Sequence, residues 1–391
     1  MKNEYDTIIV GGGIAGLMTA LRLAQNRQKV LVIEKGKIGN GATVSNHGTV
    51  HSGAHYMQRF DNIVKNCQEA QRLFFDLFSG AKVPCKNSVY IINKTSTFEF
   101  VKGLGRHNIS FVKIPLNEAP ELNPKVLKES SLLGIVEGVY SSRKLLHLLL
   151  SYCKASGVQF LLNTKVENLV IRSRKIEGVE ISSHEKLTCD NVVLASGFGT
   201  LSILKSIHSN YSDFFHSRLA TMAYLPNAKL DRGFVFADLG KPVIMPELYG
   251  GSLASVFGID QPPVSSDRNF SVNFENAQTI IRSIKRSFNA KFVDTHHTQF
   301  FVSAKTDYIN NSAIKNLANP GYSVIDHTKL DNLAGLYTIV TGKMTLAFHC
   351  SRDAAALILG TSVDLNIKKI KKATIDPNMV ITEPWSDFSN K

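Results

Sequence analysis

A glycine-rich turn between two apolar strands near the N-terminus constrains the fold of this chain most strongly. Residues 7–10 form a short β-branched run, and Gly11, Gly13 and Gly16 follow it as G-x-G-x-x-G. Apolar residues then recur at helical spacing, and a second apolar strand occupies 30–33. The order of strand, glycine turn, helix and strand predicts a βαβ unit with parallel strands.

Each part of this unit has a physical role in holding a dinucleotide. Gly11 permits a tight turn, Gly13 lets backbone approach a pyrophosphate at the positive helix end, and Gly16 lets helix and strand pack closely. Glu34 follows Gly16 by 18 residues and ends the second strand, where its carboxylate can accept ribose hydroxyls. In this context the motif predicts dinucleotide binding rather than an incidental turn.

Length and cysteine usage bound the class of protein. The 391 residues suggest two or three structural units, with one composite domain as the alternative. Its five cysteines are scattered and never spaced as C-x-x-C, so we expect neither a disulfide framework nor a zinc or iron–sulfur site. A strand pattern begins directly at the N-terminus, and we find no apolar run long enough to span a membrane. We therefore expect a reducing, cytoplasmic location.

The chain is basic, with 45 Lys and Arg against 32 Asp and Glu and a net charge of +13. Such a charge attracts anionic substrates, anionic lipid headgroups or nucleic acid. Because the charge is diffuse and there is a single Trp, we expect no nucleic-acid partner. The densest cluster comprises Lys368, Lys369, Lys371 and Lys372. It predicts a solvated face or tail, with peripheral membrane or partner contact as the alternative.

Three separated segments resemble the D-amino-acid oxidase-like (DAO) family of FAD-dependent oxidoreductases. They are VGGGIAG…VLVIEK…IGNGAT near the N-terminus, 158–200, and 335–359. The resemblance implies FAD as cofactor and a mixed fold, in which a Rossmann-like α/β FAD-binding domain is interleaved with an α+β substrate domain built on an antiparallel sheet. The expected FAD-binding parts are 1–85, 141–205 and 321–365, the substrate-domain parts are 86–140 and 206–320, and the C-terminal tail is 366–391.

The resemblance also implies the FAD contacts. The expected contact residues are Gly11, Gly13, Gly16, Glu34, Lys35, Ala42, Thr43, Asn46, His47, Gly48, Val166, Gly197, Gly342, Lys343, Met344 and Thr345. The residues at 335–359 independently predict an apolar strand, a glycine turn and a helix, whose unpaired N-terminus suits the electron-rich pyrimidine side of a reduced flavin.

Residues 45–56, SNHGTVHSGAHY, resemble the glycerol-3-phosphate dehydrogenase and L-2-hydroxyglutarate oxidase branches of that family. Chain length favours the hydroxyglutarate oxidase side. Where the glycerol phosphate branch keeps arginines that clamp an anion, this chain has His55, Phe348 and Lys305. Lys and His cannot reproduce the bidentate recognition of an Arg fork, so we do not expect glycerol 3-phosphate itself.

His51 is the candidate catalytic residue, because a hydroxyl substrate must lose its proton as hydride leaves, and neutral imidazole suits that task. The alternatives are a His51 that only packs around the flavin, and a His that binds flavin covalently. Four-residue spacing on a glycine-containing loop does not predict a metal site. The expected substrate contacts are His55, Tyr56, Tyr249, Lys305 and Lys343. Core packing is the alternative for Tyr249.

The predicted function is therefore an FAD-dependent oxidoreductase that takes hydride from a small, anionic hydroxy compound, such as a 2-hydroxy acid or a polyol phosphate. An amino-acid or amine oxidase is the alternative, and a non-catalytic or RNA-directed flavoprotein is a distant one. The expected partners are a small-molecule substrate and an electron acceptor, which could be oxygen, a quinone or a protein carrier. Peripheral membrane contact stays open.

Overall fold

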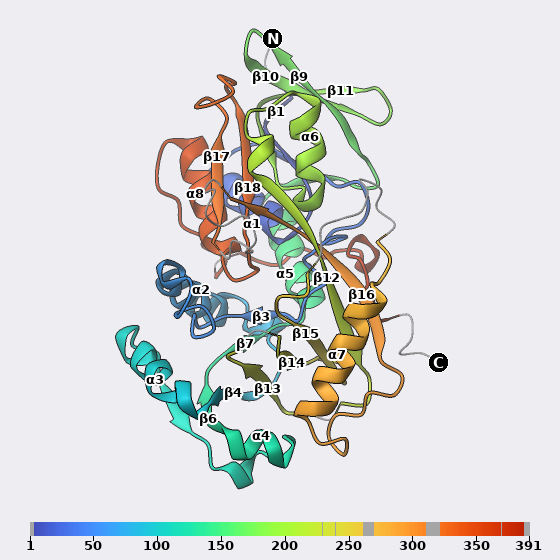
Figure 1. The fold of residues 1–391 in the computed structure, drawn as a ribbon. Coiled ribbons are helices and arrows are strands. Elements are labelled where there is room, and N and C mark those ends of the chain that lie inside the picture. Colours follow the sequence, from blue (N-terminus) through green and yellow to red (C-terminus); the bar gives the residue numbers. More distant parts are fainter. Residues whose placement is uncertain are drawn as a thin grey trace. The chain divides into compact units, whose positions relative to one another are not determined.

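The computed structural model describes residues 4–228, 230–238, 240–260, 270–309, 321–368 and 370–386. The chain divides into two compact units, and each unit is assembled from segments that are far apart in the sequence (Figure 1). Unit 1 comprises Met1–Val44, Arg143–Ser217 and Lys305–Thr382. Unit 2 comprises Ser45–Ser142, Arg218–Ala304 and Glu383–Lys391.

Unit 1 is built on a largely parallel sheet in the order β17-β18-β11-β1-β2-β8. Strand β1 lies between β2 and β11 and is parallel to both, whereas β17 is an antiparallel edge strand. Two further strands, β9 and β10, extend β11 as an antiparallel ribbon. The strands are β1 (Tyr5–Val10), β2 (Val30–Ile33), β8 (Gln159–Leu161), β9 (Val166–Arg172), β10 (Lys175–Ile181), β11 (Lys186–Leu194), β17 (Ser323–Asp326) and β18 (Leu336–Val340).

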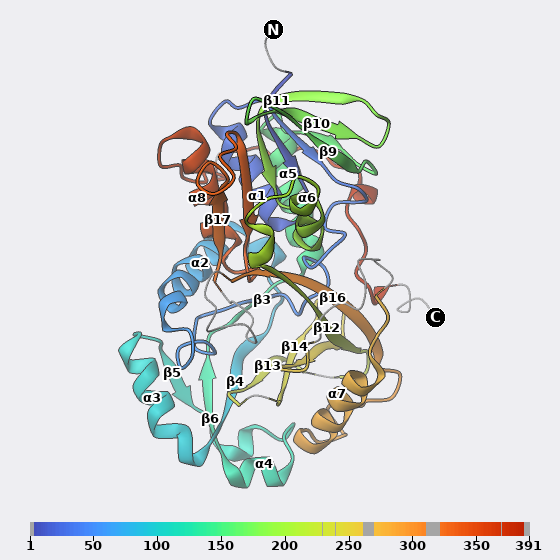
Figure 2. The same ribbon diagram turned by 45° about the horizontal axis from the view of Figure 1, so that its top comes forward.

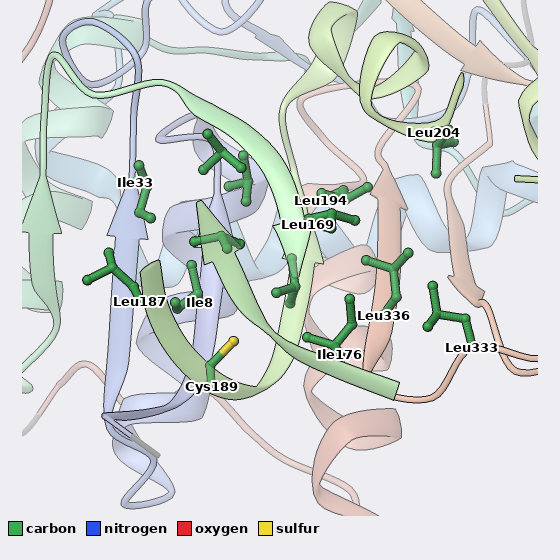
Figure 3. Close-up of a cluster of buried hydrophobic side chains, with 14 of the residues drawn as sticks. Ile8, Ile33, Leu169, Ile176, Leu187, Cys189, Leu194, Leu204, Leu333 and Leu336 are labelled. Atoms are coloured by element: carbon green, nitrogen blue, oxygen red, sulfur yellow. The ribbon is translucent and has the colours of Figure 1, made fainter. Parts of the chain in front are cut away.

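Helices of unit 1 bury apolar faces against this sheet. They are α1 (Ile14–Gln25), α5 (Ser142–Ala155), α6 (Thr200–Ser206) and α8 (Ala347–Leu359), and α1 lies beside α8 (Figure 1). The sheet's other apolar side chains form a continuous core with the β9–β11 ribbon, in which Ile8, Leu187 and Leu336 are buried (Figure 3). The β-branched run at 7–10 and the apolar run at 30–33, which predicted strands, are buried throughout.

Unit 2 is built on a second sheet, in the order β16-β12-β15-β14-β13-β4-β6-β5. Most of its neighbouring strands are antiparallel, and β13 pairs with β4 in parallel. A separate two-stranded sheet joins β3 to β7. The strands are β3 (Thr49–Val50), β4 (Lys86–Asn93), β5 (Phe111–Lys113), β6 (Ser130–Ile135), β7 (Gly138–Val139), β12 (Phe215–Leu225), β13 (Arg232–Phe236), β14 (Pro242–Pro246), β15 (Ser252–Val256) and β16 (Gln299–Tyr308). The first residues of β12 and the last residues of β16 belong to unit 1.

Helices also accompany the second sheet. They are α2 (Val64–Leu77), α3 (Thr97–Arg106), α4 (Pro124–Glu129) and α7 (Phe274–Ser287). Ile280 and Ile284 of α7 pack against Ile244 and Ala254, so this helix covers part of one sheet face (Figure 2). Short 3-10 turns occur at Asp61–Ile63, Ser79–Ala81, Lys94–Ser96, Leu116–Glu118, Gly197–Gly199, Ser212–Phe214 and Pro377–Met379.

The predicted fold class, a Rossmann-like parallel sheet combined with a mainly antiparallel one, is confirmed. The sequence at 60–80 has apolar residues at helical spacing and that at 275–289 is also predicted to be a helix, and the structure has α2 and α7 there. Helix α3 was not predicted, because its sequence contains two glycines, which lower intrinsic helix propensity. The domain boundaries expected from the resemblance remain a prediction.

The C-terminal segment after α8 contributes residues to each of the two units. Ile367 and Val380 are buried in unit 1, and Trp385 stacks on Tyr224 of unit 2 with 5.8 Å between ring centroids. Lys368, Lys371 and Lys372 are exposed, whereas Lys369 lies outside the described residues. Of the helices in the described parts of the chain, none combines the length and the apolar character that crossing a membrane requires.

Candidate functional site

The glycine turn after β1 is possible only with glycines. Gly11 has a φ of 116°, and a side chain there would place Cβ 2.5 Å from the Ala195 carbonyl oxygen. A Cβ at Gly16 would lie 2.1 Å from the Gly11 carbonyl oxygen. Both contacts are shorter than any real Cβ contact, so these positions allow the close passage of turn, helix and strand that the motif predicted.

The N-terminus of α1 is suited to an anion. Gly13 is its N-cap and provides no side-chain hydrogen bond, and the first turn contains no acidic residue. The Ile14 N–H donates to Thr43 Oγ1 at 3.2 Å, so the loop that contains Thr43 passes this end of the helix. Unpaired N–H groups and the positive end of the helix dipole favour a pyrophosphate in such a place.

Glu34 lies at the end of β2, beside the glycine turn. Its side chain is largely buried, with 8% of the residue exposed. One carboxylate oxygen accepts the Gly12 N–H at 2.8 Å, and the other accepts the Gly36 N–H at 3.1 Å. Its neighbour Lys35 is exposed, as is Ala42 in the loop that follows. Backbone donors thus fix the carboxylate at the end of β2, where the motif predicts a ribose contact.

Other predicted cofactor residues of unit 1 follow the ends of parallel strands. Gly197 comes shortly after β11 and Gly342 after β18, with φ values of 53° and 60°. Because β1, β2, β11 and β18 are parallel, the residues after them share one edge of the sheet. Lys343, Met344 and Thr345 lead from Gly342 into α8, and Val166 is the buried first residue of β9. This edge is where ligands bind in open parallel sheets.

In unit 2 the loop that contains His47 is hydrogen-bonded to β7 and to Tyr140, the residue after β7. Asn46 Oδ1 accepts the Gly48 N–H at 2.6 Å, and the His47 Nδ1 atom lies 2.7 Å from Thr49 Oγ1. Gly48 has a φ of 65°, and a Cβ there would lie 2.0 Å from the Tyr140 carbonyl oxygen. The Tyr140 N–H donates to the Gly48 carbonyl at 2.8 Å, so the two backbones meet directly.

His51 belongs to a buried polar network in unit 2. Its Nε2 atom lies 3.1 Å from the Tyr56 hydroxyl, and its Nδ1 atom lies 3.8 Å from Glu137 Oε2. The two rings meet edge to face with 5.0 Å between centroids. Burial raises the pKa of Tyr56 well above its ordinary value, so its hydroxyl stays protonated.

Glu137 accepts three hydrogen bonds from its surroundings. The Ser52 N–H donates to Oε2 at 2.9 Å, the Ser52 hydroxyl donates to Oε1 at 2.6 Å, and the Tyr90 hydroxyl donates to Oε1 at 2.7 Å. Desolvation by burial raises the pKa of this carboxyl from 4.5 to about 7, although hydrogen bonds from Ser52 and Tyr90 lower it. Glu137 therefore titrates near neutral pH, where enzymes work.

A small pocket adjoins this network. Polar side chains from the 45–56 segment, from β4 and from the residue before β7 meet apolar side chains from β13, from β14 and from the residue after β15. The lining residues are His47, His51, His55, Tyr90, Glu137, Val235, Val243, Met245 and Phe257. Convergent polar groups beside apolar side chains make this pocket a candidate small-molecule site.

A second cavity of unit 2 lies next to the 46–48 loop and is lined by residues that include Asn46, His47, Tyr140 and Trp385. The Tyr140 hydroxyl is buried, and no partner for it occurs among the residues that the structure describes. A buried hydroxyl of this kind fits a polar group of a bound ligand. Within unit 1, the glycine turn, Glu34 and the start of α1 fit the dinucleotide part of the cofactor that the resemblance implied.

The other predicted substrate residues differ in their surroundings. His55 stacks on Phe257, with 4.5 Å between centroids, and packs edge-on against Tyr56. Tyr249 is 65% exposed in the turn between β14 and β15, so the alternative of core packing is wrong for it. Lys305 and Lys343 belong to unit 1, whereas the histidines of the network belong to unit 2.

Sequence reasoning missed four residues of this site: Ser52, Tyr90, Glu137 and Arg218. A lone acid inside the apolar stretch around Glu137 was an available signal, but Tyr90 resembles any core residue of a strand. Arg218 forms an ion pair with Asp260, and its positive charge acts on Tyr56. Among the described residues, no group of three or more His, Cys, Asp and Glu is placed to hold a metal ion.

Comparisons with known proteins bear on the family and the fold of the chain. A family model described as FAD dependent oxidoreductase (DAO) matches residues 6–313, which is most of the chain. Subunit A1 of the anaerobic glycerol-3-phosphate dehydrogenase of Haloferax volcanii is 22% identical over 216 residues, covering 50% of this chain and 37% of that protein. The mitochondrial L-2-hydroxyglutarate dehydrogenase of Caenorhabditis elegans is 36% identical over 92 residues, covering 23% of this chain and 21% of that protein.

Solved structures share the fold across nearly the whole chain. Glycine oxidase from Bacillus cereus superimposes with a TM-score of 0.71 and 17% identity, covering 92% of this chain and 98% of that one. At this identity the likeness concerns the fold alone. The chain matches little more than a third of the length of the first curated relative, at 37%.

Proposed function

We propose that this chain, which belongs to the family of FAD-dependent oxidoreductases, oxidises a small hydroxy compound that carries an anionic group. A 2-hydroxy acid or a polyol phosphate has this chemistry. The observation that carries the proposal is that His51 lines a cavity of unit 2 and contacts both a phenol and a buried carboxyl. Oxidation of an alcohol releases an O–H proton as hydride leaves the adjacent carbon, and imidazole is suited to accept it.

The residues of unit 1 would hold the cofactor. Gly11, Gly13 and the start of α1 suit the pyrophosphate, and Glu34 suits the adenosine ribose. When bound, FAD supplies the acceptor for the hydride that leaves the substrate carbon. His51 accepts the hydroxyl proton, so that the substrate becomes a carbonyl compound and the proton stays on the imidazole. The apolar walls Val243 and Phe257 keep water from the reacting carbon.

An anionic substrate is supported by the charge of the chain and by two of the predicted substrate contacts. The net charge is +13, and the predicted substrate contacts include Lys305 and Lys343. His55 stands where the glycerol phosphate branch has an arginine and is stacked on Phe257, which argues against glycerol 3-phosphate itself.

An amine or amino-acid donor is the alternative substrate class. A neutral amine can give up hydride without losing a proton to a base, so it leaves the His51 network without a chemical role. The hydroxy compound is therefore the better match to the cavity. The electrons would then pass to oxygen, a quinone or a protein carrier.

Anaerobic flavin bleaching tests the proposal in one experiment. The purified holoprotein is mixed with a panel of 2-hydroxy acids, polyol phosphates, amino acids and amines, and loss of flavin absorbance is followed. We expect a hydroxy acid or a polyol phosphate to bleach the flavin fastest. Bleaching by amines or amino acids alone would overturn the proposed substrate class, and a colourless protein that takes up no FAD would contradict the cofactor.

His51→Gln provides the matched variant, with His296→Gln as an exposed control. If His51 is the base, the variant should retain FAD and be bleached by its substrate about 10²-fold more slowly. The control should behave as the unmodified protein does. An unchanged rate in His51→Gln would assign this histidine to packing.

A further inference from the structure

We propose that Glu137 is the positioning residue of His51, which keeps the imidazole proton on Nδ1 and leaves Nε2 to accept the proton of the substrate hydroxyl. The inference rests on the proposed function, in which His51 is the base. Glu137 lies 86 positions after His51 in the sequence and directly precedes β7.

The hydrogen bonds of Glu137 define which side of the imidazole can carry a proton. Its carboxylate accepts from the Ser52 N–H, the Ser52 hydroxyl and the Tyr90 hydroxyl, so these partners all act as donors toward it. A carboxylate that accepts from every neighbour presents only acceptor oxygens to His51. Nδ1 faces Oε2, and an N–H is favoured at that atom because a bare nitrogen there would meet negative charge.

The opposite ring nitrogen is placed to accept a proton. Nε2 lies 3.1 Å from the Tyr56 hydroxyl, which can donate to an unprotonated Nε2. Once Nε2 has gained the substrate proton, the same hydroxyl can accept from it, because a phenol both donates and accepts. Because the single in-plane lone pair of Nε2 faces this hydroxyl, the substrate proton passes through Tyr56, which gives its own proton to Nε2 and takes that of the substrate.

Charge compensation is the second contribution of Glu137. The Nδ1 to Oε2 separation of 3.8 Å is longer than a hydrogen bond, so the coupling is electrostatic. Both side chains are buried, and a low dielectric strengthens such an attraction. When His51 becomes an imidazolium, the carboxylate balances its charge within the protein, as the acid of a catalytic triad does.

Other groups around the pair have different roles. The His47 ring meets the His51 ring edge-on with 6.3 Å between centroids. The positive charge of Arg218 acts on Tyr56. Burial raises the pKa of Glu137 to about 7, so the carboxylate form required here is favoured above neutral pH. This agrees with a partner that supports proton removal at neutral and higher pH.

Nitrogen NMR of the holoprotein tests the inference directly. Histidines are labelled with ¹⁵N in the ring, and His51→Gln identifies the His51 signals by their loss. We expect the unmodified protein to show the tautomer with hydrogen on Nδ1 of His51 above the pH of its protonation. The opposite tautomer would overturn the inference, and this measurement requires no variant of Glu137 to fold.

Glu137→Gln then tests the charge effect. We expect the pH at which His51 gains its proton to fall by about one unit or more, because the compensating carboxylate is gone. Glu121→Gln is the matched control, since Glu121 is also buried in unit 2 and lies near Arg232 instead. If His51 gains its proton at the same pH in Glu137→Gln and in Glu121→Gln, the inference is overturned.

The two proposals fail separately in these experiments. If no hydroxy compound bleaches the flavin, the proposed substrate class is wrong, whereas the His51 tautomer still decides the role of Glu137. If a hydroxy compound bleaches the flavin but His51 carries its hydrogen on Nε2, only the inference about Glu137 is wrong. Glu137→Asp keeps a carboxylate and should restore the Nδ1 tautomer that Glu137→Gln loses.

Discussion

At the scale of single residues, Glu137 is a carboxyl that the fold keeps away from water. Its pKa rises from 4.5 to about 7 through desolvation, so the folded chain binds this proton more tightly than the unfolded chain does. Between these two values the unfolded state carries fewer protons at this site, and the free energy of unfolding must fall as pH rises. Above pH 7 the contribution levels off, because the group is then ionised in both states.

Replacing Glu137 by Gln should remove this pH dependence. We expect the unmodified protein to lose roughly 2 kcal/mol more of its free energy of unfolding between pH 5 and pH 8 than Glu137→Gln does. Urea unfolding at both pH values measures the difference. Parallel curves for the two proteins would show that Glu137 titrates as an ordinary carboxyl, and Glu121→Gln controls for the loss of any buried glutamate.

At the scale of elements, the small sheet formed by β3 and β7 depends on one glycine. Gly48 adopts a φ of 65°, and a side chain there would approach the Tyr140 carbonyl oxygen to 2.0 Å. The backbone of this loop must therefore move if any side chain is added. The same loop carries Asn46 and His47, which are predicted to contact FAD.

Gly48→Ala should destabilise the protein by roughly 1–3 kcal/mol, because it combines strained backbone with a steric clash. It should also weaken FAD retention through the displaced loop. Thermal unfolding and flavin release during gel filtration measure the two effects. Gly41→Ala is the control, since a Cβ there meets nothing within 4 Å, and equal behaviour of both variants would contradict the prediction.

At the scale of the whole molecule, cofactor binding should contribute measurably to stability. A ligand that binds only the folded state stabilises it by about 2.7 kcal/mol when its concentration is 100 times its dissociation constant. We expect removal of FAD to lower Tm by several degrees and its return to restore Tm. Riboflavin is the control, because it lacks the adenosine pyrophosphate that suits Glu34 and the start of α1; an equal shift with riboflavin would contradict that nucleotide site.

The sequence by itself determined the elements whose signals are local. Spacing of Gly11, Gly13 and Gly16 predicted a tight turn and close packing, and the structure contains both. Apolar periodicity likewise predicted α2 and α7 within a few residues of their ends. These signals succeed because backbone geometry and burial periodicity depend on neighbours a few positions away.

Only the tertiary structure decided how the candidate site is assembled. Ser52 and Glu137 are separated by 85 positions, and Tyr90 reaches the same carboxyl from the middle of β4. Periodicity marks Tyr90 as a buried strand residue but cannot specify which polar group its hydroxyl meets. The sequence therefore identified His51 as a candidate base, whereas the pairing of distant strands and loops provided its buried carboxyl, because such contacts depend on how elements pack rather than on local spacing.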